Sequence, residues 1–486
     1  MEQDSQQSGS DQREWHGNPS STADVAPLVD DELTVTVVST ANSAEGSSWL
    51  ASSLIVMNAC LGAGILNLPS AFNRAGGILS AMATNLAFLA VAFCSAMVLG
   101  WSSDRLKVNS YQDTVQSVCG RHFGRLCSLV VTVYTYCTCI TFLVVIGDQS
   151  DRLFFDQFGV DFCDRWYMDR RLIVCVLSVL FILPFCFVRK VDALKYVSGV
   201  ATLSVAYLCL LTVVAYARAD TSKVTVKTKP EYWTDVFAAV PAICFGYQCH
   251  VSIVPVYSCI RPRTLRTFRK TVVLALTVCF ATYSLVGSFG YLAFGVNVGD
   301  DLLSSMSTDS WLFLIGYACF AMKTLLTYPI VQFCGRLSIV SLLSDCMGGR
   351  APSECVQRFV VPSVFFVTSL CVATVTPGIS VVIDFLGFLA VLFIFIFPGL
   401  CWLCIELDNF DGHSTARHPL NVRVLLACTS LIFGAFLLGM TFSQTAEYTA
   451  LGVSKHEHHL CDRALARSVY WLSRRLHANY SFTFID

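Results

Sequence analysis

The segment that decides the fold reads Met57-Asn58-Ala59-Cys60-Leu61-Gly62-Ala63-Gly64-Ile65-Leu66-Asn67-Leu68-Pro69, inside an apolar run at residues 49–72. A run of about 20 apolar residues is long enough to cross a bilayer as a helix. Glycine weakens a helix by roughly 1 kcal/mol and proline by about 3 kcal/mol, and backbone groups without partners are costly in lipid. The segment therefore predicts a discontinuous membrane helix whose break at Gly62 to Gly64 holds a small charged solute. A packing notch for a neighbouring helix is the alternative.

The composition is that of a polytopic membrane protein. The chain has 486 residues, of which 55% are hydrophobic and 14% charged, and its mean hydropathy is +0.60. No basic stripe suggests a nucleic-acid partner, so the lipid bilayer is the expected environment. We predict an all-α protein with eleven transmembrane helices, at residues 49–72, 77–100, 126–147, 172–188, 194–217, 234–257, 271–294, 311–335, 359–375, 379–404 and 422–443.

Basic residues predict the orientation of these spans. The loops after even-numbered spans carry 17 Lys and Arg, and those after odd-numbered spans carry nine. Cytosolic loops are the ones enriched in Lys and Arg. We therefore expect residues 1–48 to form a disordered cytosolic tail, residues 49–443 to form the transmembrane domain, and the tail at 444–486 to be extracellular or luminal.

A second interruption lies in the sixth apolar run. It reads Pro241-Ala242-Ile243-Cys244-Phe245-Gly246-Tyr247-Gln248-Cys249-His250. Spans one and six occupy matching positions if spans 1–5 and 6–10 are two inverted repeats and the eleventh is an addition. This five-plus-five inverted repeat, with discontinuous helices 1 and 6, is typical of transporters that bind solutes at the middle of the bilayer.

The two breaks offer complementary poles. The amides of Gly62, Ala63 and Gly64 begin a half-helix and suit a carboxylate. Carbonyl groups released near Phe245 and Gly246 suit an ammonium group. An anion pole and a cation pole side by side fit the zwitterion of an amino acid. Flexibility for gating alone is the alternative.

The eighth span suggests an ion site. Thr324 and Thr327 place two hydroxyl groups on one helical face, and Asn58 would complete an oxygen shell for Na⁺. Threonine also bonds back to its own helix, which is the structural alternative. Lys323 lies deep in the same span, where a charge is costly. It either takes the cation position itself, making transport proton-linked or sodium-independent, or pairs with a carboxylate such as Asp384.

Polar residues of spans three and six suggest a subsite for the solute's side chain. Tyr134, Gln248 and His250 can supply hydrogen bonds there, although ordinary helix packing explains each of them singly. No set of residues has the spacing of a catalytic centre, so an enzyme is not expected and no cofactor beyond a coupling ion is implied.

Five motifs resemble the sodium-coupled neutral amino acid transporters of the amino acid/auxin permease superfamily. They are Asn58-Ala59-Cys60-Leu61-Gly62-Ala63-Gly64-Ile65-Leu66, Phe142-Leu143-Val144-Val145-Ile146-Gly147-Asp148-Gln149, Phe245-Gly246-Tyr247-Gln248-Cys249-His250-Val251-Ser252, Tyr328-Pro329-Ile330 with Phe333-Cys334-Gly335-Arg336, and Phe397-Pro398-Gly399-Leu400-Cys401. The resemblance implies eleven helices, an inverted repeat and alternating access. It also implies that Asn58 and Thr327 match sodium positions and that the first break binds substrate.

We therefore predict a secondary active transporter of small neutral amino acids, glutamine or asparagine first, with Na⁺ as the coupling ion and H⁺ as the alternative. A non-transporting amino acid sensor in an endolysosomal membrane is a rival from another class. The segment Asp24-Val25-Ala26-Pro27-Leu28-Val29 loosely resembles an acidic dileucine sorting signal. Both the lysosomal or endosomal membrane and the plasma membrane remain open.

Overall fold

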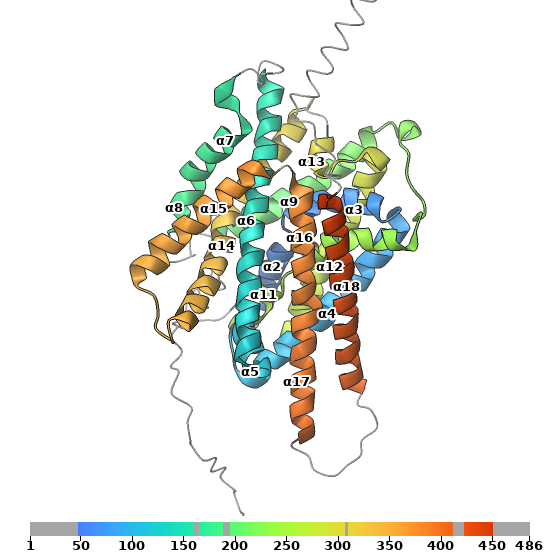
Figure 1. The fold of residues 1–486 in the computed structure, drawn as a ribbon. Helices are drawn as coiled ribbons and strands as arrows, with labels where there is room; N and C mark the ends of the chain where they lie inside the picture. The colour runs from blue at the N-terminus through green and yellow to red at the C-terminus, as the bar shows by residue number, and fades with distance from the viewer. Residues whose placement is uncertain are drawn as a thin grey trace, which may run out of the picture.

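The computed structural model describes residues 47–158, 165–187, 195–306, 310–376, 378–411 and 422–450. Within these residues the regular structure is helical, and the one extended pairing is an isolated parallel bridge between Ser47 and Ile260. Figure 1 shows long helices that run roughly parallel, with α17 beside α18. The expectation of an all-α membrane protein is confirmed.

The elements follow one another along the chain with short 3-10 and π-helical pieces, labelled η, between the α-helices. They are α2 (Trp49–Cys60), η1 (Ala63–Asn67), α3 (Leu68–Arg74), α4 (Ile78–Leu106), α5 (Tyr111–Cys119), α6 (Arg121–Phe158), η3 (Trp166–Met168), α7 (Arg170–Leu177), η4 (Ser178–Ile182), α8 (Leu183–Cys186), α9 (Lys195–Arg218), η6 (Thr221–Lys223), η7 (Trp233–Ala239), α10 (Val240–Tyr247), α11 (His250–Cys259), α12 (Leu265–Phe294), η8 (Gly295–Asn297), α13 (Leu302–Ser305), α14 (Trp311–Cys346), η9 (Val356–Val360), α15 (Val361–Val375), α16 (Ile379–Val391), η10 (Leu392–Ile396), α17 (Phe397–Asp411) and α18 (Val422–Ala450).

Nine helices of the described chain are long and apolar enough to cross a membrane, and a bent pair makes ten. The fourth predicted span, residues 172–188, is not among them. That region consists of α7, the π-helical piece η4 and α8, which together are shorter than a typical span. The last span continues to Ala450, beyond its predicted end at residue 443.

The first span is broken where the glycines predict it. α2 begins after Ser48, whose hydroxyl accepts a hydrogen bond from the amide of Ala51, and it ends at Cys60. Leu61 and Gly62 are not helical, and Gly62 has an extended backbone with φ −84° and ψ −160°. The two halves of the span are bent by 53°.

The sixth span is interrupted two residues later than Gly246. α10 carries Pro241 in its first turn, where proline needs no amide partner, and so the helix continues through Gly246. The interruption falls at Gln248, with φ −74° and ψ 94°, and at Cys249. The expected break is therefore present but displaced toward α11.

The two interrupted spans are surrounded by long helices. α12 packs against both α2 and α3, and α14 packs along α6. α16 approaches α10 closely because Gly387 lies against the backbone of Pro241, where a Cβ atom would overlap it. This packing encloses both breaks within the bundle and leaves their backbone groups to be satisfied by side chains and by whatever enters from solvent.

Candidate binding site between the two interrupted spans

A cavity of about 200 Å³ lies where the two breaks meet. This volume is sufficient for several water molecules or one small solute. Its wall includes eight of the eleven predicted site residues, namely Asn58, Gly62, Tyr134, Phe245, Gln248, Lys323, Thr324 and Thr327. Ala63, Gly64 and Gly246 do not line it.

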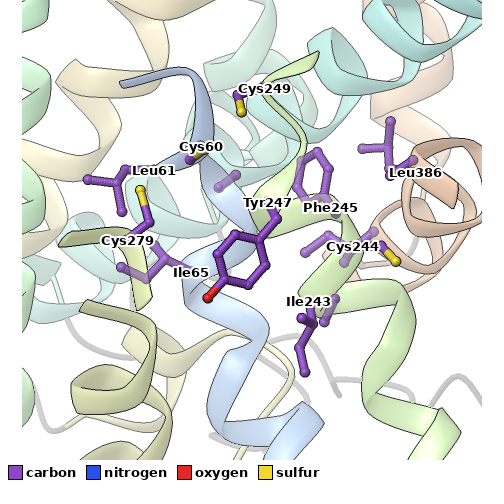
Figure 2. Packing of buried hydrophobic residues seen from close by; sticks show 14 of the residues in the cluster. Cys60, Leu61, Ile65, Ile243, Cys244, Phe245, Tyr247, Cys249, Cys279 and Leu386 are labelled. Atoms are coloured by element: carbon purple, nitrogen blue, oxygen red, sulfur yellow. The ribbon is translucent and has the colours of Figure 1, made fainter. Parts of the chain in front are cut away.

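The breaks touch each other beside this cavity. Figure 2 shows Cys60 and Leu61 of the first span next to Phe245, Tyr247 and Cys249 of the sixth. A Cβ atom on Gly64 would lie 2.7 Å from Cδ1 of Phe245. Gly64 therefore serves the close approach of the two spans.

Fewer backbone amides are available to an anion than the sequence predicts. The amide of Gly62 donates to the carbonyl oxygen of Cys60 over 2.7 Å, so that donor is already used. Ala63 and Gly64 begin the 3-10 helix η1, and amides in the first turn of a helix have no partner within it. Both residues are buried behind the cavity wall.

The carbonyl groups predicted to bind a cation are not free in the structure. The carbonyl oxygen of Phe245 accepts from the amide of Gln248 over 3.3 Å. That of Gly246 accepts from the hydroxyl of Tyr283 over 2.7 Å. Both carbonyl groups predicted to be available to an ammonium group already have donors, because the break lies after them.

Gln248 supplies the unpaired donor on the cavity wall. Its Oε1 atom accepts from the amide of His250 over 2.9 Å, which identifies the other terminal atom as the NH₂ group. This Nε2 atom is buried and has no hydrogen-bond partner among the described residues. A buried amide without a partner is costly, and a ligand acceptor in the cavity would relieve that cost.

His250 does not join the proposed subsite. Its Nε2 atom lies 2.7 Å from the hydroxyl oxygen of Ser95 on α4. The residue is fully buried and does not line the cavity. In this structure His250 therefore contacts α4 and lies outside the cavity wall.

Tyr134 closes another part of the wall. Its ring meets those of Phe245 and Phe393 edge-on, with centroids 6.3 Å and 5.4 Å away. Aromatic rings in this arrangement form an apolar surface of fixed shape. The third span thus contributes a rigid apolar side to the cavity.

Lys323 brings its charge to the first break. Its Nζ atom donates to the carbonyl oxygen of Leu61 over 2.5 Å and lies 4.7 Å from the ring centroid of Phe320. Asp384 instead pairs with Arg74 over 3.2 Å. The suggested pairing of Lys323 with Asp384 is therefore wrong.

The predicted oxygen ligands lie around the same point. Thr324 donates to the carbonyl oxygen of Ala321 over 2.8 Å, and Thr327 donates to that of Lys323 over 2.7 Å. Both hydroxyl groups thus bond back to their own helix, while their oxygen lone pairs can still accept. Oδ1 of Asn58 accepts from Thr202 on α9 over 3.0 Å.

Two contributors were missed by sequence reasoning. Thr202 bonds to Asn58, and Tyr283 bonds to both breaks. The threonine is one of many small polar residues in the apolar runs, and the tyrosine is one of 17 in the chain. No spacing or motif distinguishes either residue from ordinary helix packing.

A polar network lies at the far end of the first span. Arg74 donates to Asp384 on α16 and, over 2.9 Å, to Oδ1 of Asn67. Asn67 donates over 2.9 Å to the carbonyl oxygen of Asp300, whose carboxylate accepts from Ser70 over 2.9 Å. The second half of the span is thereby tied to α16 and to the segment before α13.

Comparisons with known proteins agree with this architecture. The family described as transmembrane amino acid transporter protein matches residues 45–443. Sodium-coupled neutral amino acid transporter 7 of Danio rerio is 34% identical over 82% of the chain and 87% of its own length, and that of Homo sapiens is 34% identical over 81% and 87%. Solute carrier family 38 member 8 of Homo sapiens is 32% identical over 82% of the chain and 94% of its length.

A similar fold is found in a solved structure. The crystal structure of MhsT in complex with L-phenylalanine has a TM-score of 0.54 and 12% sequence identity, and the match covers 83% of this chain and 100% of MhsT. At that identity the likeness concerns the fold alone.

Proposed function

The chain belongs to the transmembrane amino acid transporter family, and we propose that it is a secondary active carrier of small neutral amino acids. Family membership identifies a transporter and not an enzyme. Glutamine and asparagine are the proposed first substrates. Transport proceeds by alternating access around the cavity between the two breaks.

The unpaired amide of Gln248 carries the substrate proposal. Its NH₂ group is buried on the wall of the cavity and lacks an acceptor in the described part of the chain. The side-chain carbonyl of glutamine or asparagine is such an acceptor, and the apolar side formed by Tyr134 and Phe245 suits the methylene groups. The amides of Ala63 and Gly64, which have no partner within η1, remain the proposed anion pole for the α-carboxylate, whereas the amide of Gly62 already donates to Cys60.

We propose Na⁺ as the coupling ion. The relatives of Danio rerio and Homo sapiens that are 34% identical are named sodium-coupled transporters. Asn58, Thr324 and Thr327 all line the cavity and provide oxygen atoms of the kind that hard cations prefer. This placement supports an ion site beside the first break.

Lys323 favours a second candidate for coupling. Its ammonium group already contacts the carbonyl oxygen of Leu61, in the position where a cation would neutralise the end of α2. A sodium ion 4 Å from an ammonium group would be repelled by about 4 kcal/mol at an effective dielectric constant near 20. In this second candidate Lys323 replaces the metal ion, and transport is proton-linked or sodium-independent.

The architecture and location are proposed as follows. Eleven crossings and a five-plus-five inverted repeat are retained, with Arg170–Cys186 in α7 to α8 as the fourth crossing. Residues 1–48 are proposed to lie in the cytosol, and the tail after residue 443 on the opposite side of the membrane. Ser47, near the end of the first of these segments, pairs with Ile260. Residues 1–46 and 451–486 lie outside the described chain. The proposed location is a lysosomal, endosomal or plasma membrane.

Uptake of labelled glutamine into proteoliposomes tests the proposal. The purified chain is given an inward Na⁺ gradient, an inward H⁺ gradient, or neither, and Thr327→Val is measured alongside. We expect saturable uptake driven by Na⁺, with a Na⁺ requirement shifted to higher concentration in Thr327→Val. Uptake driven only by H⁺ supports the Lys323 candidate. Binding without uptake of any neutral amino acid would overturn transport and favour the sensor.

A further inference from the structure

Tyr283 connects the two helix breaks through a single hydroxyl group. The residue lies on α12, and its side chain is 1% exposed. Its hydroxyl oxygen is 2.8 Å from the carbonyl oxygen of Cys60, at the end of α2. It is also 2.7 Å from the carbonyl oxygen of Gly246, near the end of α10. The carbonyl groups at the ends of α2 and α10 therefore share the Tyr283 hydroxyl as a hydrogen-bond donor.

The number of protons makes this contact sensitive to movement. Both carbonyl groups are among the last four of their helices, which have no intrahelical donor. The carbonyl oxygen of Cys60 also accepts from the amide of Gly62, whereas that of Gly246 accepts from Tyr283. A tyrosine hydroxyl carries one proton and can donate fully to only one carbonyl at a time. While Cys60 and Gly246 stay together, they share this proton. Separation of the two breaks would break the bond from Tyr283 to one of the two carbonyl groups, and with it the link between α2 and α10.

The ring of Tyr283 is fixed in place from two sides. The ring of Tyr247 meets it edge-on at 5.3 Å between centroids. The hydroxyl of Tyr247 donates to Oδ1 of Asn85 on α4 over 2.8 Å, and Nδ2 of Asn85 donates to Ser284 over 3.1 Å. Gly246 lacks a Cβ atom, which would otherwise sit 3.3 Å from the Tyr283 ring. The hydroxyl is therefore held between the breaks.

We infer that Tyr283 is a positioning residue for transport, which sets the relative placement of the two breaks without touching the solute. Tyr283 does not line the cavity. The carbonyl groups that it joins lie two positions before Gly62 and two positions before Gln248, both of which do. The inference rests on the proposed function for its effect on uptake, but the structural link itself does not.

Tyr283→Phe removes the hydroxyl and retains the ring. Tyr317→Phe is the matched control, because Tyr317 is equally buried and its hydroxyl also lies between two carbonyl oxygens, of Leu303 at 3.1 Å and of Met306 at 3.2 Å. We expect KM for glutamine to rise about tenfold in Tyr283→Phe, with a smaller change in kcat. In Tyr317→Phe, KM should stay within roughly twofold of the parent chain. Equal changes of KM in both variants would overturn the inference.

A second measurement needs no substrate. Cys60 and Cys249 line the cavity at the two breaks, so their alkylation by N-ethylmaleimide reports how tightly the breaks are held. Mass spectrometry of the two peptides should show alkylation at least about fivefold faster in Tyr283→Phe than in the parent chain or Tyr317→Phe. Equal rates in all three proteins would also overturn the inference.

One outcome separates this inference from the proposed function. If the parent chain transports no neutral amino acid but Tyr283→Phe still accelerates alkylation, the proposed function fails and the link stands. If Tyr283→Phe does not fold, Tyr247→Phe replaces it, because it removes the bond to Asn85 and leaves the Tyr283 hydroxyl in place. A smaller acceleration in the same direction is then expected, and unchanged alkylation would contradict the inference.

Discussion

Lys323 donates a hydrogen bond from Nζ to the carbonyl oxygen of Leu61 over 2.5 Å. This contact brings a positive charge from α14 to the point where the first span loses its helical structure. Asn58 and Thr327 line the same cavity. An ammonium group and a sodium ion at this position would compete for the same oxygen atoms.

Replacement of Lys323 by methionine should therefore increase the affinity for Na⁺. Methionine keeps an unbranched side chain of similar length and removes the charge. Because repulsion between neighbouring cations is worth several kcal/mol, we expect the Na⁺ concentration for half-maximal uptake to fall at least tenfold. Sodium titration of glutamine uptake measures this change.

Lys323→Arg is the matched control, since it retains the charge. Its sodium response should resemble that of the parent chain, although its bulk can slow uptake. If Lys323→Met has the same sodium dependence as the parent chain, competition between the ammonium group and Na⁺ is refuted.

Gln248→Leu should lower the preference for substrates that carry an amide. The change removes the unpaired NH₂ donor, together with the Oε1 atom that accepts from the amide of His250, and keeps most of the side-chain volume. One lost hydrogen bond predicts a rise in KM for glutamine of about tenfold, while KM for alanine changes little. Uptake of the two amino acids, measured in the same vesicles, gives the ratio.

Gln332→Leu serves as its comparison. Gln332 is also buried, but its Nε2 atom already donates to the carbonyl oxygen of Pro362 over 2.8 Å. Its replacement should reduce stability and leave the ratio of KM values unchanged. A ratio that moves equally in both variants would remove Gln248 from the binding site.

The two glycines of the first break should respond differently to alanine. A Cβ atom on Gly64 would lie 2.7 Å from Phe245, whereas on Gly62 the nearest atom is the carbonyl oxygen of Cys60 at 3.9 Å. We expect Gly64→Ala to lose most uptake, because overpacking forces the breaks apart. Gly62→Ala should retain at least about half. Equal uptake by both variants would show that the observed contact with Phe245 is unimportant.

The ion pair between Arg74 and Asp384 should be strongly coupled. The side chains are only 17% and 9% exposed, so removing one partner strands the other charge. Arg74→Gln and Asp384→Asn should each lower the melting temperature. Each single decrease should be more than half of the decrease in the double variant. The exposed pair of Lys107 and Asp104 provides the comparison. Replacement of either residue should change the melting temperature little. Additive losses at Arg74 and Asp384 would contradict the coupling.

The sequence predicts the two breaks because their cause is local. Gly62 and Gly64 weaken the helix at their own positions, and the break falls at Leu61 and Gly62. The sixth span shows the limit of this reasoning. Pro241 belongs to the stretch where the sixth span is predicted to be interrupted, yet it lies in the first turn of α10, where it is compatible with helix.

The contacts between distant segments could not be predicted from local composition. The sequence offers Asp384 as a partner for Lys323 because both are buried charges in apolar runs. Arg74 is the group that reaches Asp384, since the second half of the first span places it beside α16. Tyr283 is similarly hidden, because its bonds depend on how α12 packs between the breaks.

The first span is fastened at both outer ends. Ser47 is paired with Cys259 and Arg261 through backbone hydrogen bonds of 2.8 Å and 3.1 Å, and Arg74 is paired with Asp384. Its halves behave as two rods, about 18 Å long for α2 and about 20 Å for η1 with α3, joined at 53°. Straightening them would increase the end-to-end distance by about 4 Å, which exceeds the range of a hydrogen bond and would break the contacts at one end unless the partner segments moved as well. The span can therefore change the direction of its bend more easily than its bend angle. Its two halves would rotate together at a constant angle to each other.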